Sequence, residues 1–144
     1  MPGPPVPFTD ITILLLYGMP NKGKTTFAHF LANQTHAILP LDPICFSVCD
    51  THSDTLKPFI IDSIPISRQL GNILRKLLKD NCTTILDNMT HDIFINCCKE
   101  IDEYVKKHKF IIIEGYILEA IPKLREHLVQ YITQNKWRYW ICHK

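Results

Sequence analysis

The residues with the clearest chemistry lie near the N-terminus, between Gly18 and Thr26. Their spacing fits G-x-x-x-x-G-K-[ST], a pattern typical of a loop that binds the phosphates of a nucleotide. A polyphosphate needs several backbone N–H donors that point toward one place, and glycines let the chain turn and approach closely. The residues expected to contact the phosphates are Gly18, Met19, Pro20, Asn21, Lys22, Gly23, Lys24, Thr25 and Thr26.

Two side chains of this loop have separate expected roles. The Lys24 ammonium should reach the β- and γ-phosphates, and the Thr25 hydroxyl should coordinate Mg²⁺. The free N–H groups at the start of a following helix, and the positive end of its dipole, would add to the site. The loop therefore predicts binding of a nucleotide together with Mg²⁺, with an accidental glycine-rich turn as the alternative.

The segments on either side of the loop favour the functional interpretation. A run of apolar residues up to Tyr17 predicts a buried strand over about 8–17. After the loop, Phe27, Phe30 and Leu31 recur at helical spacing and predict a helix over 26–33. A strand, a glycine loop and a helix in this order form the structural context that the motif requires.

Three acidic residues follow predicted strands. Asp42 ends the predicted strand 37–42, Asp87 ends 83–87 and Glu114 ends 110–114. In open α/β sheets ligands bind at the carboxyl ends of the strands, and Mg²⁺ is usually held by one or two carboxylates and several waters. Asp87 and Glu114 are therefore the candidate metal ligands. The alternative for Asp42 is an ordinary turn aspartate before a proline. The alternative for Asp87 and Glu114 is a strand-end residue without a function.

The remaining segments predict an alternation of strands and helices. Helices are expected from Ser67 onward and over about 92–107 and 119–134, and a last strand over 137–142. This order predicts an α/β fold with a mostly parallel sheet of about five strands and helices on both faces, a three-layer αβα sandwich. Residues 44–65 show no clear pattern, and the proline-rich residues 1–7 predict a loose tail.

Composition sets the broad class of the protein. A chain of 144 residues, with 46% hydrophobic and 21% charged residues, is expected to form one domain over 1–144. The net charge of +2 does not by itself imply nucleic acid or an acidic membrane surface. The six cysteines lack zinc-ligand spacing and are interpreted as reduced thiols of a cytoplasmic protein. No signal peptide or membrane span is expected.

The segments around Gly18–Thr26, Leu86–Asn88 and Ile112–Tyr116 resemble the P-loop kinases of small molecules and nucleotides. The resemblance implies the P-loop NTPase fold, ATP and Mg²⁺, and transfer of the γ-phosphoryl group to the hydroxyl or phosphate of a small acceptor. It implies Lys24 as a catalytic residue and Asp42 as the carboxylate that orients or deprotonates the acceptor. Such kinases usually have a lid with several arginines.

In that lid region this chain offers only Lys123 and Arg125, so Arg125 is the expected catalytic cation. Arg68 or Arg75 would substitute if their helix faces the site. Because so few arginines are available, the enzyme could also depend on a partner protein that supplies the missing cation.

Two other functions remain open at this stage. An ATP-binding switch would use the same loop without transferring phosphate. A polynucleotide 5′-end kinase would need a basic channel, formed by Lys76, Lys79 and the run 106–109 on one face beside the loop. A GTPase is disfavoured, because Arg138 stands where a guanine-reading aspartate would be and no D-x-x-G occurs.

Overall fold

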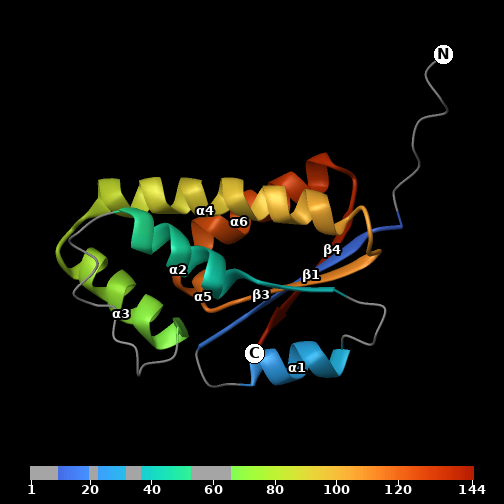
Figure 1. Cartoon of the computed structure of the whole chain (residues 1–144), viewed down its shortest axis with the longest axis horizontal. Coiled ribbons are helices and arrows are strands. Elements are labelled where there is room, and N and C mark those ends of the chain that lie inside the picture. Colours follow the sequence, from blue (N-terminus) through green and yellow to red (C-terminus); the bar gives the residue numbers. More distant parts are fainter. Residues whose placement is uncertain (1–9, 20–22, 32–36, 53–65) are drawn as a thin grey trace, which may run out of the picture.

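The computed structural model describes residues 10–19, 23–31, 37–52 and 66–144, and the statements below refer to these residues. Four strands form one parallel sheet in the order β2-β3-β1-β4. They are β1 (Thr12–Tyr17), β2 (Ala37–Pro40), β3 (Phe110–Glu114) and β4 (Arg138–His143). Helices lie on both faces of the sheet, so the predicted α/β class is confirmed (Figure 1).

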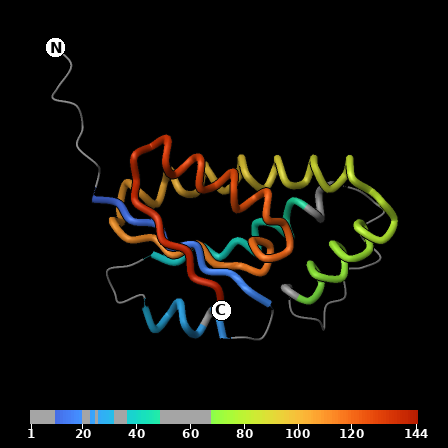
Figure 2. Tube along the Cα trace, turned by 180° about the vertical axis from the view of Figure 1, so that it is seen from behind, coloured from blue at the N-terminus to red at the C-terminus, as the bar shows by residue number. Residues whose placement is uncertain are grey.

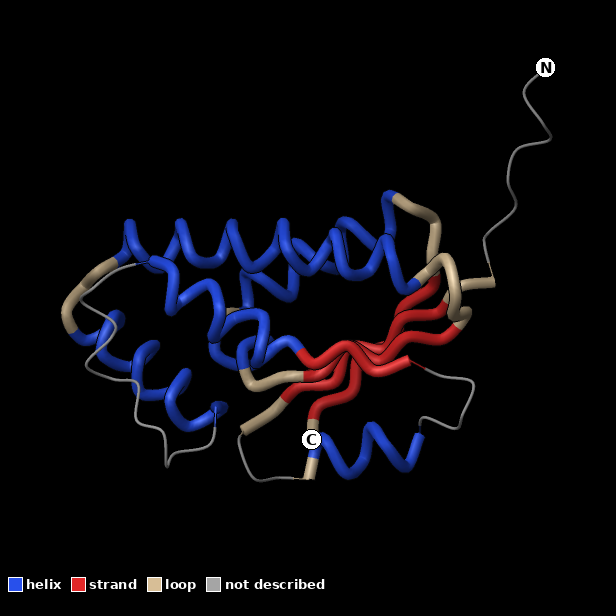
Figure 3. The backbone as a smooth tube through the Cα atoms, in the orientation of Figure 1, coloured by secondary structure: helices blue, strands red, loops and turns tan. Residues whose placement is uncertain are grey.

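Helix α1 (Lys24–Leu31) covers one face of the sheet (Figure 3). The other face is covered by α2 (Leu41–His52), α4 (Thr83–Tyr104), α5 (Ile117–Ala120) and α6 (Pro122–Gln134). Helix α3 (Ile66–Lys79) packs beside α2, α4 and α5 at one end of the molecule. The two layers of helices are therefore very unequal in size.

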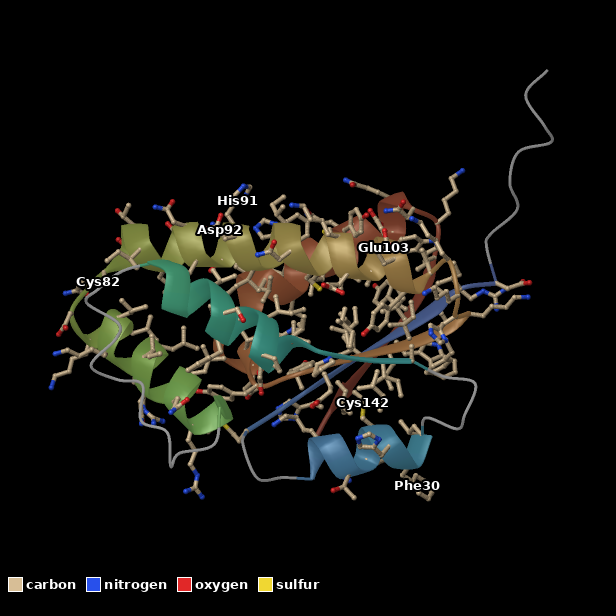
Figure 4. All side chains as sticks on the ribbon, in the orientation of Figure 1. Phe30, Cys82, His91, Asp92, Glu103 and Cys142 are labelled. Atoms are coloured by element: carbon tan, nitrogen blue, oxygen red, sulfur yellow. The ribbon has the colours of Figure 1, made fainter. Side chains whose placement is uncertain are left out.

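The hydrophobic core explains why β1 and β3 are continuous apolar runs. Both strands are central, so the side chains on both of their faces must be buried. Ile13 and Leu15 belong to the large core on the α4 and α6 side, whereas Leu14 and Leu16 pack in the smaller core under α1. Figure 4 shows Cys142 between the sheet and α1, and Phe30 pointing away from the molecule.

The predicted strand 83–87 is wrong, because these residues form the beginning of α4. The short β-branched run suggested a strand, but its apolar residues continue at helical spacing through Ile93, Cys97 and Ile101, which are all fully buried. Asn81 separates α3 from α4 in a left-handed conformation, with φ of 56°. The sheet in the described part of the chain therefore has four strands instead of about five.

Other segments differ from prediction in smaller ways. Residues 41–52 form α2, so Asp42 lies in the first turn of a helix and not at the end of a strand. The helix predicted over 119–134 is divided into α5 and α6 at Ile121. The rest of the unreadable stretch, 53–65, and the proline-rich tail lie outside the described residues. None of the described helices is both long and apolar enough to span a bilayer.

Candidate phosphate-binding site

All four strands are parallel, so their carboxyl ends meet at one edge of the sheet (Figure 2). In register, Leu16 of β1 lies opposite Glu114 of β3, and Tyr17 lies opposite His143 of β4. Gly18 follows β1 and leads toward α1, which begins at Lys24. The glycine loop therefore lies at the edge where ligands bind in open parallel sheets.

The ammonium of Lys24 is buried at this edge, with only 7% of the residue exposed. Its Nζ donates hydrogen bonds to the carbonyl oxygens of Gly18, at 3.0 Å, and of Met19, at 2.8 Å. Gly23, just before it, has φ of 80°, which a residue with a side chain would adopt only with strain. The loop thus turns the Lys24 side chain back across its own backbone.

Three carboxylates act on the Lys24 ammonium. Burial lowers the pKa of Lys24, and the negative charges of Asp42, Glu114 and Glu119 oppose that effect. The Lys24 ammonium is therefore attracted by three acidic groups, in addition to the hydrogen bonds that it donates to the carbonyls of Gly18 and Met19.

Asp42 is held by the start of α5. Its carboxylate accepts hydrogen bonds from the backbone N–H groups of Tyr116 and Ile117, the latter at 3.3 Å. Burial raises the pKa of Asp42, and these two N–H groups and Lys24 partly offset the rise. A Cβ on Gly115 would lie only 2.7 Å from Asp42 Oδ1, so the tight approach requires glycine. Asp42 is thus both a helix cap and a neighbour of Lys24.

Glu114 is the second predicted acid that the structure brings to the loop. It ends β3 and is buried, with 7% of the residue exposed. Its register partner Leu16 packs in the core under α1, so Glu114 points toward the same face of the sheet. This position places the carboxylate on the side where the loop enters α1.

Glu119 and His143 are residues of this edge that the sequence did not reveal. Glu119 lies in α5, a helix of four residues, and its Oε2 is 3.0 Å from Nε2 of His143. The imidazole of His143 in turn packs edge-on against Tyr17, with ring centroids 5.0 Å apart. Neither residue belongs to a motif, and only the fold places α5 and the end of β4 beside the loop.

Arg125 comes to the same edge but already has structural partners. Its guanidinium lies 4.3 Å from the centroid of the Tyr17 ring, and it donates a hydrogen bond to the carbonyl of Leu118 at 2.7 Å. These contacts fix the end of β1 and the short helix α5. The predicted role of Arg125 as the catalytic cation stays a prediction.

Asp87 does not join the other acids. It lies exposed on α4, beside a cavity of about 230 Å³ between α4 and α6. The argument that made it a metal ligand depended on a strand end that does not exist. Of the loop, residues 20–22 and the side chain of Thr25 lie outside the described part, and Met19 and Thr26 are exposed. In that described part, no three His, Cys, Asp or Glu side chains form a ready metal site.

The basic residues do not form a channel beside the loop. Residues 106–109 precede β3, and the carbonyl of Lys109 accepts a hydrogen bond from the N–H of Thr12 at the start of β1. They therefore lie at the amino ends of the strands, opposite to the loop. Lys76 forms an exposed ion pair with Asp80, with 3.0 Å between Nζ and Oδ2.

The sequence matches no known family model and no curated protein.

The raised pKa of Asp42 predicts a pH-dependent gain in stability for Asp42→Asn. The carboxyl group has an ordinary pKa of 3.8 in the unfolded chain and a higher one in the fold. The folded wild type therefore holds the proton more tightly, and its free energy of unfolding should fall, through this group, as the pH rises from about 4 through the raised pKa. The amide oxygen of asparagine can still accept the hydrogen bonds from the start of α5, and asparagine carries no charge whose burial would cost free energy.

Urea unfolding at several pH values measures the difference. Asp42→Asn should match the wild type near pH 3 and exceed it at pH 7. Asp87→Asn, an exposed change on α4, should stay within about 0.5 kcal/mol of the wild type throughout. A loss of stability in Asp42→Asn that is largest at pH 7 would show that the attraction between Asp42 and Lys24 outweighs the cost of burying the carboxylate.

Proposed function

We propose that this chain is a phosphotransferase that binds ATP with Mg²⁺ at the glycine loop and moves the γ-phosphoryl group to a small metabolite or nucleotide. The observation that carries the proposal is the buried Lys24 ammonium at the carboxyl edge of a parallel sheet, inside a complete G-x-x-x-x-G-K-[ST] motif. The non-transferring ATP switch shares this loop. The presence of Asp42 at the same edge favours transfer.

Lys24 would provide the charge that holds the phosphates. Its ammonium is bound to two carbonyls of the loop itself, so it lies at the mouth of the loop before any ligand arrives. Burial also lowers its pKa, because the ammonium loses contact with water there. A phosphate oxygen would replace part of that water with a charge-assisted hydrogen bond, which is stronger than a neutral one.

The residues at the loop fit a magnesium ion. Thr25, by its place in the motif, and the buried carboxylate of Glu114 would hold it, with water and phosphate oxygens as the remaining ligands. The charge of Glu114 acts on Lys24, which supports a site beside the phosphates that Lys24 would hold. When bound, Mg²⁺ neutralises phosphate charge during transfer. Asp87 is no longer a candidate for this role.

Asp42 would act on the acceptor. A general base works best when its pKa lies near the operating pH, and burial shifts the pKa of Asp42 upward. The hydrogen bonds from the start of α5 fix the direction of its carboxylate. Helix α3 packs against α2 and α5, and a Cβ built on Gly71 of α3 would lie 3.4 Å from the Tyr116 ring. Because the backbone of Tyr116 holds the Asp42 carboxylate, we expect the acceptor on the side of α2 and α3.

The activity is tested by incubating the wild type with Mg²⁺, ATP and candidate acceptors, and by measuring the release of ADP. Nucleosides, nucleoside monophosphates and phosphorylated sugars form the first panel. The polynucleotide end kinase is less favoured, because its expected lysines do not line the loop. ATP binding without ADP release in the presence of any acceptor would favour the switch.

Lys24→Met should remove nucleotide turnover while leaving the fold intact. The variant keeps the aliphatic stem of the side chain and removes only the ammonium, so kcat/KM should fall by roughly 10²–10³-fold. Lys123→Met, an exposed change on α6, is the matched control. A folded Lys24→Met variant with the ATP affinity and turnover of the wild type would disprove the functional interpretation of the motif.

Glu114→Gln should raise the Mg²⁺ concentration needed for half-maximal activity by about tenfold, because it replaces a charged ligand with a neutral one. ATP affinity without metal should change much less. Asp87→Asn should leave the Mg²⁺ dependence as it is in the wild type. An equal Mg²⁺ requirement in Glu114→Gln and the wild type would remove Glu114 from the metal site.

A further inference from the structure

The residue after β4 lies directly on the glycine loop. The backbone N–H of Lys144 donates a hydrogen bond to the carbonyl of Tyr17 at 2.8 Å, which continues the pairing of β1 with β4 by one residue. The carbonyl oxygen of Lys144 occupies the place where a side chain of Gly18 would be, only 1.8 Å from a Cβ built there. Figure 1 shows this end of β4 beside the start of α1.

The Lys144 side chain extends over the first turn of α1. Its ammonium nitrogen is 4.4 Å from the centroid of the Phe27 ring, and its Cε is 3.8 Å from a Cβ built on Gly23. The N–H of Phe27 donates to the carbonyl of Gly23 at 2.8 Å, so this ring belongs to the turn at which the helix begins. The ammonium therefore lies at the positive end of the helix dipole.

This position is electrostatically unfavourable without a ligand. A cation is repelled by the N-terminal end of a helix, whereas an anion is attracted by it. The contact with the Phe27 ring offsets part of the repulsion, because an exposed cation–π pair contributes about 0.5–1 kcal/mol. Among the described residues Lys144 has no carboxylate partner in an ion pair. An anion between the ammonium and the helix end would be attracted by the charge of the ammonium and by the positive end of the helix dipole.

The site also needs a cation besides Lys24. The Lys24 ammonium faces three carboxylates, and the guanidinium of Arg125 is engaged with Tyr17 and the carbonyl of Leu118. A nucleoside triphosphate brings about four negative charges to the same place, and these charges need positive partners. Lys144 is exposed and lies at the loop, so its ammonium is available to a ligand.

We infer that Lys144 binds the β- and γ-phosphates of the nucleotide, as a second cation opposite the N-terminal end of α1. The inference rests on the proposed function, because it assumes that the phosphates occupy the loop. It assigns a phosphate-binding role to a residue that lies outside the motif. The site should favour nucleoside di- and triphosphates over monophosphates, since Lys144 adds attraction for each phosphate beyond the first.

The test compares two substitutions of Lys144 in the full chain. Lys144→Met keeps the stem on Phe27 and removes the charge, and Lys144→Arg keeps the charge. Lys107→Met, at the opposite edge of the sheet, is the matched control. Calorimetric titration with ATP, ADP and AMP, each with Mg²⁺ at low and at moderate salt, gives the dissociation constants. Thermal unfolding of each variant checks the fold, and Lys144→Gln replaces Lys144→Met if that variant is unstable.

Lys144→Met should raise the Kd of ATP and ADP by about tenfold, as expected for the loss of a charged hydrogen bond. Its ATP affinity should also depend less on salt. AMP binding should change less than threefold, and Lys144→Arg and Lys107→Met should bind ATP as the wild type does. Unchanged ATP affinity in Lys144→Met, with a wild type that binds ATP, overturns this inference alone. A wild type that binds no ATP overturns the proposed function and this inference together.

Discussion

One buried ammonium group sets the conditions for the rest of the site. Placing the charge of Lys24 where it is 7% exposed costs several kcal/mol unless polar groups replace the lost water. The carbonyls of Gly18 and Met19 do so directly, and Asp42, Glu114 and Glu119 do so through their charges. Burial lowers the pKa of Lys24 despite these partners, which supports our proposal that a phosphate binds here.

The fold brings these groups together by simple means. The parallel pairing of β1 and β3 places their ends side by side, so the loop after β1 lies next to Glu114 at the end of β3. Asp42 reaches Lys24 because α2 begins directly after β2, and Gly115 leaves room for the Asp42 carboxylate against α5. The ends of β1 and β4 stay together through the hydrogen bond of Lys144 to Tyr17. Asp42 is thus held by backbone N–H groups as well as by the charge of Lys24.

The sequence alone predicted the parts of the site that depend on local pattern. Strand β3 and its terminal Glu114 follow from an uninterrupted apolar run, and the loop follows from its glycine spacing. The strand predicted at 83–87, on which the choice of Asp87 depended, was wrong, because five residues cannot distinguish a strand from the first turns of a long helix. Glu119 and Lys144 have no local signal at all. Their positions depend on tertiary contacts between α5, β4 and the loop, which no single stretch of sequence contains.

We propose that the loop and the start of α1 hold the phosphates of ATP. Backbone amide NMR during titration with MgATP would locate the nucleotide, since the amide signals report contacts residue by residue. We expect the largest shifts at Gly18, Gly23, Lys24 and the first turn of α1, with small shifts for Asp87 and its neighbours on α4. Shifts that are absent, or that are centred on the cavity between α4 and α6, would contradict this proposal.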